Sequence, residues 1–422
     1  MNLITKVPKG TKDIIGAESD KTVWLEALLR DTVRPFGYGE VRTPVFEHTE
    51  LFERGVGDTT DVVTKEMYTF EDKGGRSITL RPEGTAGAVR AFLESGAYAG
   101  TLPVRMYYFA NCYRYEKPQA GRWREFEQFG VEMFGSKEPY ADAEVISIPY
   151  RIFEKLGLLE SITLNINSIG CPECRQHYQK ALYEYFSSHK DKLCETCLTR
   201  LDKNPMRIID CKSPVCSEIA KGAPIMLDYL CDECREHFEK VKKLLTEMGI
   251  SFEVDPTIVR GLDYYTKTVF EFVSNGIGAQ GTVCGGGRYD GLCTQLGGVD
   301  MPALGFGMGI GRLLMVLGDY DFGIDNAPAV YIGSIGDEAK AKAMVICDAL
   351  RASGVSAQCD IMARSVKAQM KYADKVGAKY SVILGEQECA DNRAKIKNMS
   401  DKTEREISLS NFVNEFKEIY NG

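Results

Sequence analysis

The sequence has no long apolar run and no excess of positive charge. No stretch approaches the ~18–20 consecutive apolar residues that a membrane span needs, and the N-terminal segment MNLITKVPKG lacks the apolar core of a signal peptide. These absences predict a cytoplasmic protein with no membrane partner. A net charge of −8 argues against a protein that coats nucleic acid non-specifically, because such binding depends on neutralisation of phosphates by Lys and Arg.

The length of the chain, 422 residues, allows two or three domains that each bury a core. The stretch Gly318–Pro328 is rich in turn residues and has neither helical nor strand periodicity, which is typical of a connection. We therefore predict a first domain at residues 1–320, a linker at 321–328 and a second domain at 329–422.

The second domain alternates strand and helix patterns. Hydrophobic periodicity predicts strand, helix, strand, helix and strand at Ala329–Gly333, Ala339–Arg351, Ser356–Ile361, Ser365–Val376 and Tyr380–Leu384. This alternation indicates an α/β domain of ordinary size. The second helix carries Lys367 and Lys371 four residues apart, and such a stripe is either a solvated face or a contact to an RNA backbone.

The first domain contains one pattern that indicates a pocket. The sequence predicts a helix at Lys21–Val33 and strands at Val41–Val45, Val104–Ala110, Cys112–Tyr115 and Phe126–Phe134. Along the last strand, the period of two places four residues on one face, namely Phe126, Gln128, Gly130 and Glu132. Because polar groups share this face with an aromatic ring and a glycine, we predict a polar pocket inside a sheet rather than a solvated strand.

Arginines and glycines near this strand indicate a nucleotide-binding site. Arg114, with Arg122 and Arg124 of the adjoining polar loop, supplies planar forks that bond phosphate oxygens in pairs. In Gly305–Arg312 a glycine at every second position leaves one strand face bare, and a flat ring such as adenine would fit there. The simpler alternative is a glycine strand packed against a helix. Arg81–Thr85 places a carboxylate and a hydroxyl near a helix N-terminus, which is also consistent with a capped helix.

Eight of the fourteen cysteines fall in four pairs within one region. The pairs are Cys171 and Cys174, Cys194 and Cys197, Cys211 and Cys216, and Cys231 and Cys234. Repeated C-x2-C spacing is typical of tetrahedral zinc, and eight thiols suffice for two sites, either sequential or interleaved. The alternative is that these cysteines are reduced, buried small hydrophobes. The four histidines are interpreted as surface or capping residues.

Together these segments resemble the class II aminoacyl-tRNA synthetases, and among them the histidyl family. The similarity covers essentially the whole chain and is carried by motif 1 at Phe36–Arg54, motif 2 at Arg114–Glu132, motif 3 at Gly305–Arg312, the two histidyl-specific stretches Val259–Tyr265 and Gly285–Leu292, the insertion at Leu201–Lys212 and the anticodon-binding segment Ser365–Gly385. The resemblance implies an α+β catalytic domain with a mainly antiparallel sheet and a Cys-rich insertion at about 170–240. It also implies that the α/β domain binds the anticodon.

The resemblance further implies a chemistry. The chain would activate L-histidine with ATP and Mg²⁺ to histidyl-adenylate, transfer it to the 3′-terminal adenosine of tRNA(His), and form a homodimer through motif 1. The implied roles are as follows: catalysis by Arg260 and Arg114; histidine binding by Glu83, Thr85, Gln128, Glu132, Tyr264, Tyr265 and Tyr289; ATP binding by Arg114, Glu116 and Arg312; tRNA contact by Arg122, Arg124, Lys367 and Lys371; and, from the spacing alone, zinc binding by the eight paired cysteines.

Two alternatives to this function remain at this stage. One is the non-catalytic relative that regulates ATP phosphoribosyltransferase, but that protein lacks an anticodon domain and varies in its activation residues. This chain retains Arg260, Arg114 and Arg312 and continues to Gly422. The other is a class II synthetase for a different amino acid, against which Glu132 and the run Arg260–Tyr265 argue.

Overall fold

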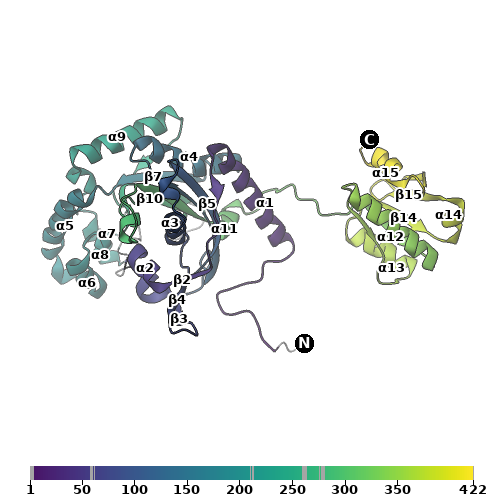
Figure 1. Ribbon diagram of the computed structural model, residues 1–422, viewed down its shortest axis with the longest axis horizontal. Coiled ribbons are helices and arrows are strands. Elements are labelled where there is room, and N and C mark those ends of the chain that lie inside the picture. Colours follow the sequence, from purple (N-terminus) through teal and green to yellow (C-terminus); the bar gives the residue numbers. More distant parts are fainter. Residues whose placement is uncertain are drawn as a thin grey trace. The chain divides into compact units, whose positions relative to one another are not determined.

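The structure, a computed structural model, describes residues 4–57, 60, 62–209, 211, 213–258, 264–274, 276 and 281–421. The chain divides into two compact units, Met1–Phe322 and Gly323–Gly422 (Figure 1). Residues 320–328 form neither helix nor strand. Among the described helices, none is both long and apolar enough to cross a bilayer.

An eight-stranded sheet forms the centre of the first unit. Its strands are β1 (Gly39–Glu40), β5 (Val104–Tyr113), β6 (Glu125–Phe134), β7 (Ile162–Ser168), β8 (Glu253–Val254), β9 (Thr266–Ser274), β10 (Thr282–Arg288) and β11 (Ala303–Gly309). They lie in the order β1-β5-β6-β11-β10-β9-β7-β8. All neighbours from β5 to β7 pair antiparallel, whereas the edge strands β1 and β8 pair parallel. The predicted mainly antiparallel sheet is therefore confirmed.

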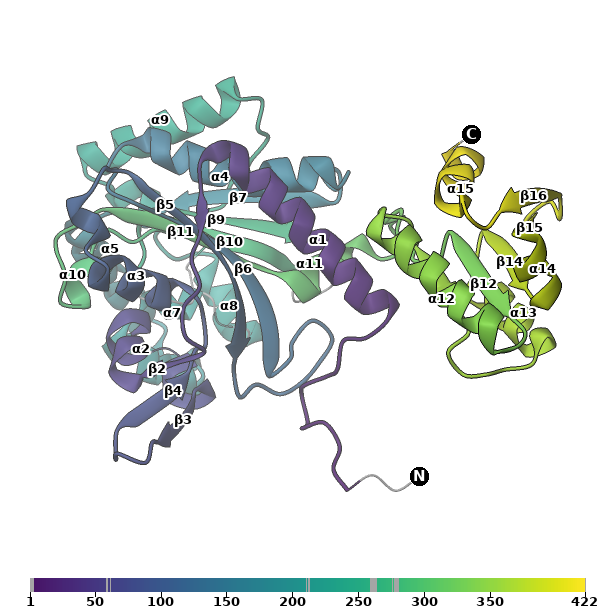
Figure 2. The same cartoon turned by 45° about the vertical axis from the view of Figure 1, so that its right-hand side comes forward.

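The two faces of this sheet have different roles. One face is covered by α1 (Ala17–Val33), α4 (Pro139–Lys155), α9 (Asp232–Glu247) and α11 (Ile310–Leu317), and it buries the main apolar core (Figure 2). The opposite face packs against α3 (Thr85–Glu94) and α10 (Leu292–Gln295). Because Phe129, Val131 and Met133 of β6 point into the main core, Gln128 and Glu132 point to the α3 face.

Two strand predictions are wrong in the region before this pocket. Cys112–Tyr115 is not a separate strand, because β5 runs unbroken from Val104 to Tyr113. Val41–Val45 forms no strand either, since β1 ends at Glu40 and β2 (Phe46–His48) begins after it. Pro44 lacks an N–H, and the Arg81 guanidinium donates hydrogen bonds to the carbonyls of Thr43 at 3.0 Å and Pro44 at 3.3 Å. The Arg81 side chain thus supplies hydrogen bonds that a neighbouring strand would otherwise make.

A small second sheet lies on the side of the large sheet that packs against α3, which is called the pocket face below. It consists of β2, β4 (Ser77–Leu80) and β3 (Tyr68–Glu71), in the order β2-β4-β3 with antiparallel pairing. α2 (Thr49–Val56) follows β2, and its buried residues Phe52 and Val56 pack against Ala86 of α3. This sheet therefore positions β4, which leads directly into Arg81–Thr85.

The Cys-rich insertion is helical and lies between β7 and α9. Its helices are α5 (Pro172–Ser187), α6 (Glu195–Lys203), α7 (Met206–Ile209) and α8 (Pro214–Ala220), which lie together in Figure 1. They share a core of their own that includes Tyr178, Leu182, Phe186 and Leu201. The insertion is thus a small packed body, joined to the large sheet by α5 at its start and by α9, which follows it.

The second unit has a five-stranded sheet in the order β13-β12-β14-β15-β16, parallel at β13, β12 and β14 and antiparallel beyond. Its elements are β12 (Val330–Ser334), α12 (Asp337–Ala352), β13 (Ala357–Cys359), α13 (Val366–Lys375), β14 (Tyr380–Leu384), α14 (Glu386–Asp391), β15 (Arg393–Asn398), β16 (Glu404–Ser408) and α15 (Phe412–Asn421). The five predicted elements are confirmed. The four elements after β14 were not predicted.

Candidate active site

The segment Arg81–Thr85 turns from β4 into α3 beneath the large sheet. The Glu83 carboxylate accepts hydrogen bonds from the N–H groups of Thr85 and Ala86, both at 2.7 Å, so it caps the helix. Glu83 is nevertheless buried, and burial raises the pKa of its carboxyl above the ordinary value. The Gly84 N–H donates to Gln128 Oε1 at 3.0 Å. This contact joins the turn to β6, so that Glu83 and Gln128 can line the same pocket.

Glu132 lies at the centre of the pocket face. Its side chain is fully buried, and it accepts hydrogen bonds from the hydroxyls of Tyr108, at 3.1 Å, and Tyr289. Burial raises the pKa of Glu132 to about 8, although the hydrogen bonds oppose this rise by favouring the ionised form. A carboxyl group whose pKa lies near neutrality and which retains further acceptor positions can exchange a proton with a polar ligand ring.

Aromatic side chains form the wall beside Glu132. The ring of Tyr264 lies 4.7 Å from that of Tyr265 and 5.5 Å from that of Tyr289, measured between centroids. All three tyrosines are buried. Burial holds the pKa of Tyr264 and of Tyr289 well above the ordinary value, so these hydroxyls remain protonated. The pocket therefore combines an apolar wall with phenolic groups suited to a small, planar, polar ligand.

The glycines of β11 provide the space that the polar side chains occupy. Gly305 is paired with Glu132 and Gly309 with Gln128 across the ladder between β11 and β6. A Cβ atom at Gly305 would collide with the Glu132 carboxylate, and one at Gly307 with the Gln128 amide. The glycine face of this strand, which was predicted to be open to a flat ring, is thus largely covered by Glu132 and Gln128, two residues predicted to bind histidine.

The predicted ATP-binding residues gather at the other end of the same strands. Arg114 donates from Nε to the Pro82 carbonyl at 2.8 Å, and its guanidinium lies 5.3 Å from the centre of the Phe126 ring. Arg312 donates to the carbonyls of Gly121 at 3.1 Å and Thr282 at 2.8 Å. Burial, and then the cations of Arg122 and Arg114, lower the pKa of Arg312. Such a concentration of positive charge fits a polyphosphate.

The polar loop at residues 114–124 is stabilised by ion pairs and hydrogen bonds among its own residues. Glu116 forms an ion pair with Arg122 at 2.9 Å. Arg124 donates to the Glu116 carbonyl at 3.2 Å, and its guanidinium lies 3.9 Å from the centre of the Tyr115 ring. The loop thus places Arg122 and Glu116 near Arg312, while Arg124 packs against the loop and against the N-terminal segment at Lys9 and Gly10.

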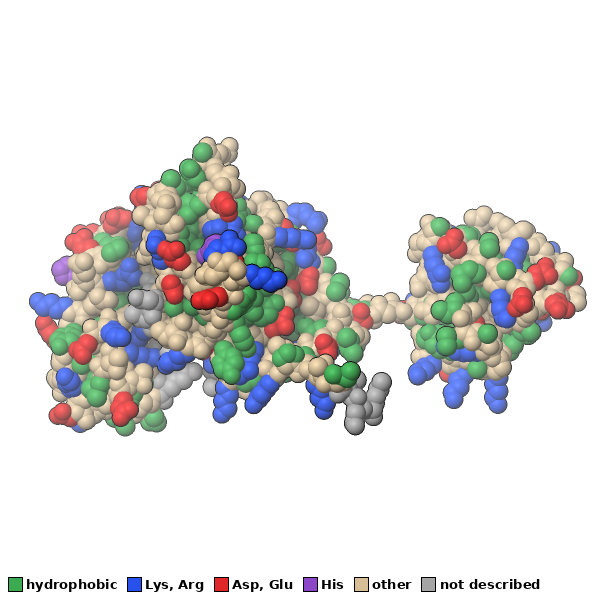
Figure 3. Space-filling model, turned by 60° about the horizontal axis from the view of Figure 1, so that its bottom comes forward, with side chains coloured by type: hydrophobic (Ala, Val, Ile, Leu, Met, Phe, Trp, Pro, Cys, Tyr) green, Lys and Arg blue, Asp and Glu red, His purple; other side chains and the backbone are tan. Residues whose placement is uncertain are grey.

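Some of the predicted site residues lie elsewhere. Arg260 falls outside the described residues, together with the rest of the run 259–263. Lys367 and Lys371 lie on α13 of the second unit and are exposed. Figure 3 shows Lys and Arg side chains projecting from one edge of that unit.

Two groups that support the pocket were not predicted from the sequence. Tyr108 pairs with Gly130 in the β5–β6 ladder, and the missing side chain at Gly130 leaves room for its ring. Behind the pocket, the buried Asp142 carboxylate forms an ion pair with Arg288, and it lies 3.2 Å from His237 Nε2. Although burial opposes ionisation, Arg288 lowers the pKa of Asp142 to about 2. The interpretation of His237 as a surface residue is therefore wrong.

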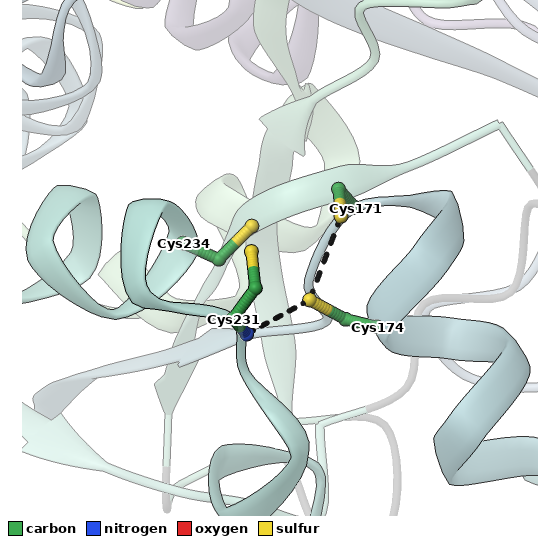
Figure 4. A group of neighbouring side chains, drawn as sticks. All are labelled: Cys171, Cys174, Cys231 and Cys234. Carbon is green, nitrogen blue, oxygen red and sulfur yellow. Dashed lines mark hydrogen bonds between the residues drawn. The ribbon is translucent and has the colours of Figure 1, made fainter.

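The eight paired cysteines form two groups of four. Cys171, Cys174, Cys231 and Cys234 make up one group, and their sulfur atoms all lie within 4.8 Å of one another (Figure 4). The other group consists of Cys194, Cys197, Cys211 and Cys216, whose sulfur atoms also lie within 4.8 Å of one another. The first pair thus meets the fourth and the second meets the third. This nested arrangement is neither of the two that were expected.

The sheet and the pocket define a class of enzyme. A mainly antiparallel sheet carries a buried glutamate and tyrosines on one face, arginines stand at the neighbouring strand–helix junction, and a separate α/β unit follows. Together these features are those of a class II aminoacyl-tRNA ligase.

Comparison with known proteins identifies the member of this class. The family model for histidyl-tRNA synthetase matches residues 10–313, and that for the anticodon binding domain matches residues 329–419. The chain is 54% identical to the histidine–tRNA ligase of Caldanaerobacter subterraneus over 96% of its own length and 98% of the relative's. It is also 54% identical to that of Acetivibrio thermocellus, over 98% and 100%. The apo histidyl-tRNA synthetase of S. aureus superposes with a TM-score of 0.84 at 37% identity, covering 98% of this chain and 100% of that one.

The chain therefore belongs to the histidyl-tRNA synthetase family, and it is a histidine–tRNA ligase.

Proposed function

We propose that the Glu132 pocket binds L-histidine and that the neighbouring arginines hold ATP for its activation. The observation that carries this proposal is Glu132 itself, which is fully buried, bonded by two tyrosine hydroxyls and tuned by burial to a pKa of about 8. Buried carboxyl groups with strongly shifted pKa values cluster at binding and catalytic sites. An imidazole ring, which titrates near neutrality, matches Glu132 in charge and hydrogen bonding.

In this proposal, histidine is recognised at both of its polar ends. Glu132 accepts from one imidazole nitrogen and Tyr265 bonds the other, while Tyr264 and Tyr289 enclose the ring. Glu83, Thr85 and Gln128 hold the α-amino group. A site built on buried hydrogen bonds rejects amino acids that lack these groups by roughly 10⁴–10⁵-fold, so no editing step is needed.

Activation then takes place beside the histidine carboxylate. Arg114 holds the α-phosphate of ATP, Arg312 the adenine face or the γ-phosphate, and Glu116 the adenine amine. Mg²⁺ accompanies the nucleotide and is held largely by phosphate oxygens. Arg260 neutralises the charge that develops at the α-phosphate as the histidine carboxylate attacks and pyrophosphate leaves.

The other expected partners follow from the same chemistry. Arg122 and Arg124 contact the acceptor end of tRNA(His), and the exposed Lys367 and Lys371 contact an RNA backbone, positioning it rather than reading its sequence. The chain acts in the cytoplasm as a homodimer through Phe36–Arg54.

Zinc is the metal that the cysteine groups fit. A tetrahedral site with Zn–S bonds of about 2.3 Å separates its sulfur atoms by about 3.8 Å. Cys171 and Cys174 Sγ are 3.5 Å apart, and Cys194 and Cys211 Sγ are 3.9 Å apart. All fourteen cysteines carry reduced thiols. We propose one structural zinc ion in each group of four.

Histidine-dependent exchange of labelled pyrophosphate into ATP, followed by charging of total tRNA, tests the proposed activity. We expect exchange with histidine alone among the amino acids and charging of a single tRNA species. Arg260→Ala should abolish exchange while calorimetry still detects histidine binding. No exchange in the wild-type protein would contradict the proposed activity, and near-normal exchange in Arg260→Ala would contradict the role of that residue.

A further inference from the structure

The cysteine group at Cys171, Cys174, Cys231 and Cys234 lies where the insertion joins the large sheet. We propose that a metal ion bound by these four thiols is a positioning site for the histidine pocket. The inference rests on the proposed zinc binding and on the proposed histidine site. The second cysteine group, within the insertion, has no such role and serves as an internal control.

The four thiols join the beginnings of two helices. Cys171 is the residue before α5 and Cys174 lies in its first turn; Cys231 and Cys234 stand in the same positions on α9. Helix N-termini favour thiolates, because the free N–H groups point toward them. The Cys231 N–H donates to Cys174 Sγ at 3.1 Å, so the two pairs already share a contact (Figure 4). A bound ion would lock the two helices at this point.

The first of these helices reaches the tyrosine wall directly. Arg175, next to Cys174, donates from its guanidinium to the Tyr265 carbonyl at 3.1 Å. Gly170, next to Cys171, accepts the Lys267 N–H at 2.9 Å, and a Cβ atom at Gly170 would lie 2.6 Å from the Cys174 Cβ. The segment that carries Tyr264 and Tyr265 is therefore hydrogen-bonded on both sides of the first cysteine pair.

The second helix reaches the same wall by two routes. Glu233, between Cys231 and Cys234, forms an ion pair with Lys267 at 2.8 Å. One turn further along α9, His237 contacts the buried Asp142 at 3.2 Å, and Asp142 pairs with Arg288, the neighbour of Tyr289. Movement of the first turn of α9 would thus disturb Lys267 on one side and the Tyr289 backbone on the other. The histidine ring is held between these two segments.

The second cysteine group has a similar local geometry but different neighbours. Cys194 precedes α6 and Cys197 lies in its first turn, and the Cys194 N–H donates to Cys216 Sγ at 3.2 Å. Its surroundings are the apolar side chains of the insertion, such as Leu193, Leu201 and Ile208. Loss of an ion here would loosen the insertion and leave the contacts of α5 and α9 to the pocket in place.

Matched single substitutions in the full-length protein separate the two groups. Cys234→Ser and Cys197→Ser each remove one buried thiol from the first turn of a helix. Zinc is counted by elemental analysis, and the Kd values of histidine and ATP are measured by calorimetry. We expect two zinc equivalents in the wild-type protein and one in each variant. The histidine Kd should rise about tenfold in Cys234→Ser, with the ATP Kd unchanged, and should stay at the wild-type value in Cys197→Ser.

Reversible removal of zinc keeps the test independent of whether Cys234→Ser folds. In Cys197→Ser a chelator can remove only the ion of the first group, so the histidine Kd should rise as zinc is lost and recover when Zn²⁺ is restored. A histidine Kd that is unaffected by this loss, or equal shifts in both variants, would overturn the inference, as would wild-type protein without zinc. Failure of histidine-dependent exchange in zinc-loaded wild-type protein would instead contradict the proposed function.

Discussion

The Tyr289 hydroxyl donates a hydrogen bond to the Glu132 carboxylate across an intervening strand. Glu132 lies on β6 opposite Gly305 of β11, and Gly305 in turn lies opposite Gly287 of β10. Because Gly305 has no side chain, the Glu132 carboxylate can extend over the middle strand to the Tyr289 phenol. The contact between these two side chains thus depends on a glycine.

Removal of the carboxylate should weaken the recognition of histidine without affecting ATP. Glu132→Gln keeps the shape of the side chain but replaces one carboxylate oxygen by an NH2 donor, and a lost hydrogen bond to a charged group costs about 1.5–3 kcal/mol. We expect the KM for histidine in pyrophosphate exchange to rise roughly 10²-fold, with the KM for ATP near its wild-type value. A parallel rise in both KM values would show that the substitution had damaged the site as a whole.

A methyl group at Gly305 should have a similar effect by displacing Glu132. The Cβ of Gly305→Ala would collide with the Glu132 carboxylate and with the Val131 carbonyl, and such overpacking typically costs about 1–3 kcal/mol. We expect a lower midpoint of urea unfolding and a higher histidine Kd. Gly311→Ala is the matched control, because nothing lies within 4 Å of the position its Cβ would take. Its midpoint should equal or exceed that of the wild type. Equal behaviour of the two variants would contradict this account of Gly305.

Periodicity identified one half of the pocket and missed the other. The period of two placed Gln128 and Glu132 on one face of a strand, and the structure agrees. Tyr108 was not predicted as part of the pocket, because its contact with Glu132 depends on the register that pairs Tyr108 with Gly130. Register depends on the conformation of the loop between the strands, which the residue pattern of one strand does not contain. Tyr264 and Tyr289 were identified through family resemblance, and their contact with each other is a property of the tertiary fold.

The cysteine groups illustrate the same limit at longer range. Spacing identified four pairs, each of which is local to one turn of chain. Which pairs meet depends on the path of the insertion, where α5 leaves the sheet and α9 returns to it, so the first and last pairs are brought together. Likewise, apolar and β-branched residues made Val41–Val45 look like a strand, but the Arg81 side chain supplies the hydrogen bonds there.

The Arg81 guanidinium should therefore be a strong determinant of stability. It donates to the carbonyls of Thr43, Pro44 and Asn111, and its side chain is buried. Arg81→Lys retains the charge but cannot reproduce the planar fork, so we expect a loss of about 3 kcal/mol in the free energy of unfolding. Arg76→Lys is the control, since Arg76 is exposed and pairs with Asp72 four residues away. Its effect should be much smaller. Equal losses in urea denaturation would refute the role of Arg81.

The raised pKa of Glu132 should make the ligand-free protein less stable as the pH rises. Its pKa is about 8 in the folded state and 4.5 ordinarily. Between these values the folded protein binds a proton that the unfolded chain has released. The stability that Glu132 contributes is thus fully present below pH 4.5 and is lost as the pH rises through about 8, at most about 1.4 kcal/mol per pH unit.

Glu132→Gln isolates this contribution from those of other buried carboxyl groups. The free energy of unfolding, measured in urea between pH 5.5 and 8.5, should fall less steeply with pH in the variant than in the wild type. Glu160→Gln, a substitution at an exposed site, should follow the wild-type curve. If Glu132→Gln followed it as well, Glu132 would be ionised throughout this range in the ligand-free protein. The pocket would then meet histidine as a fixed negative charge rather than as a group that exchanges a proton with the ring.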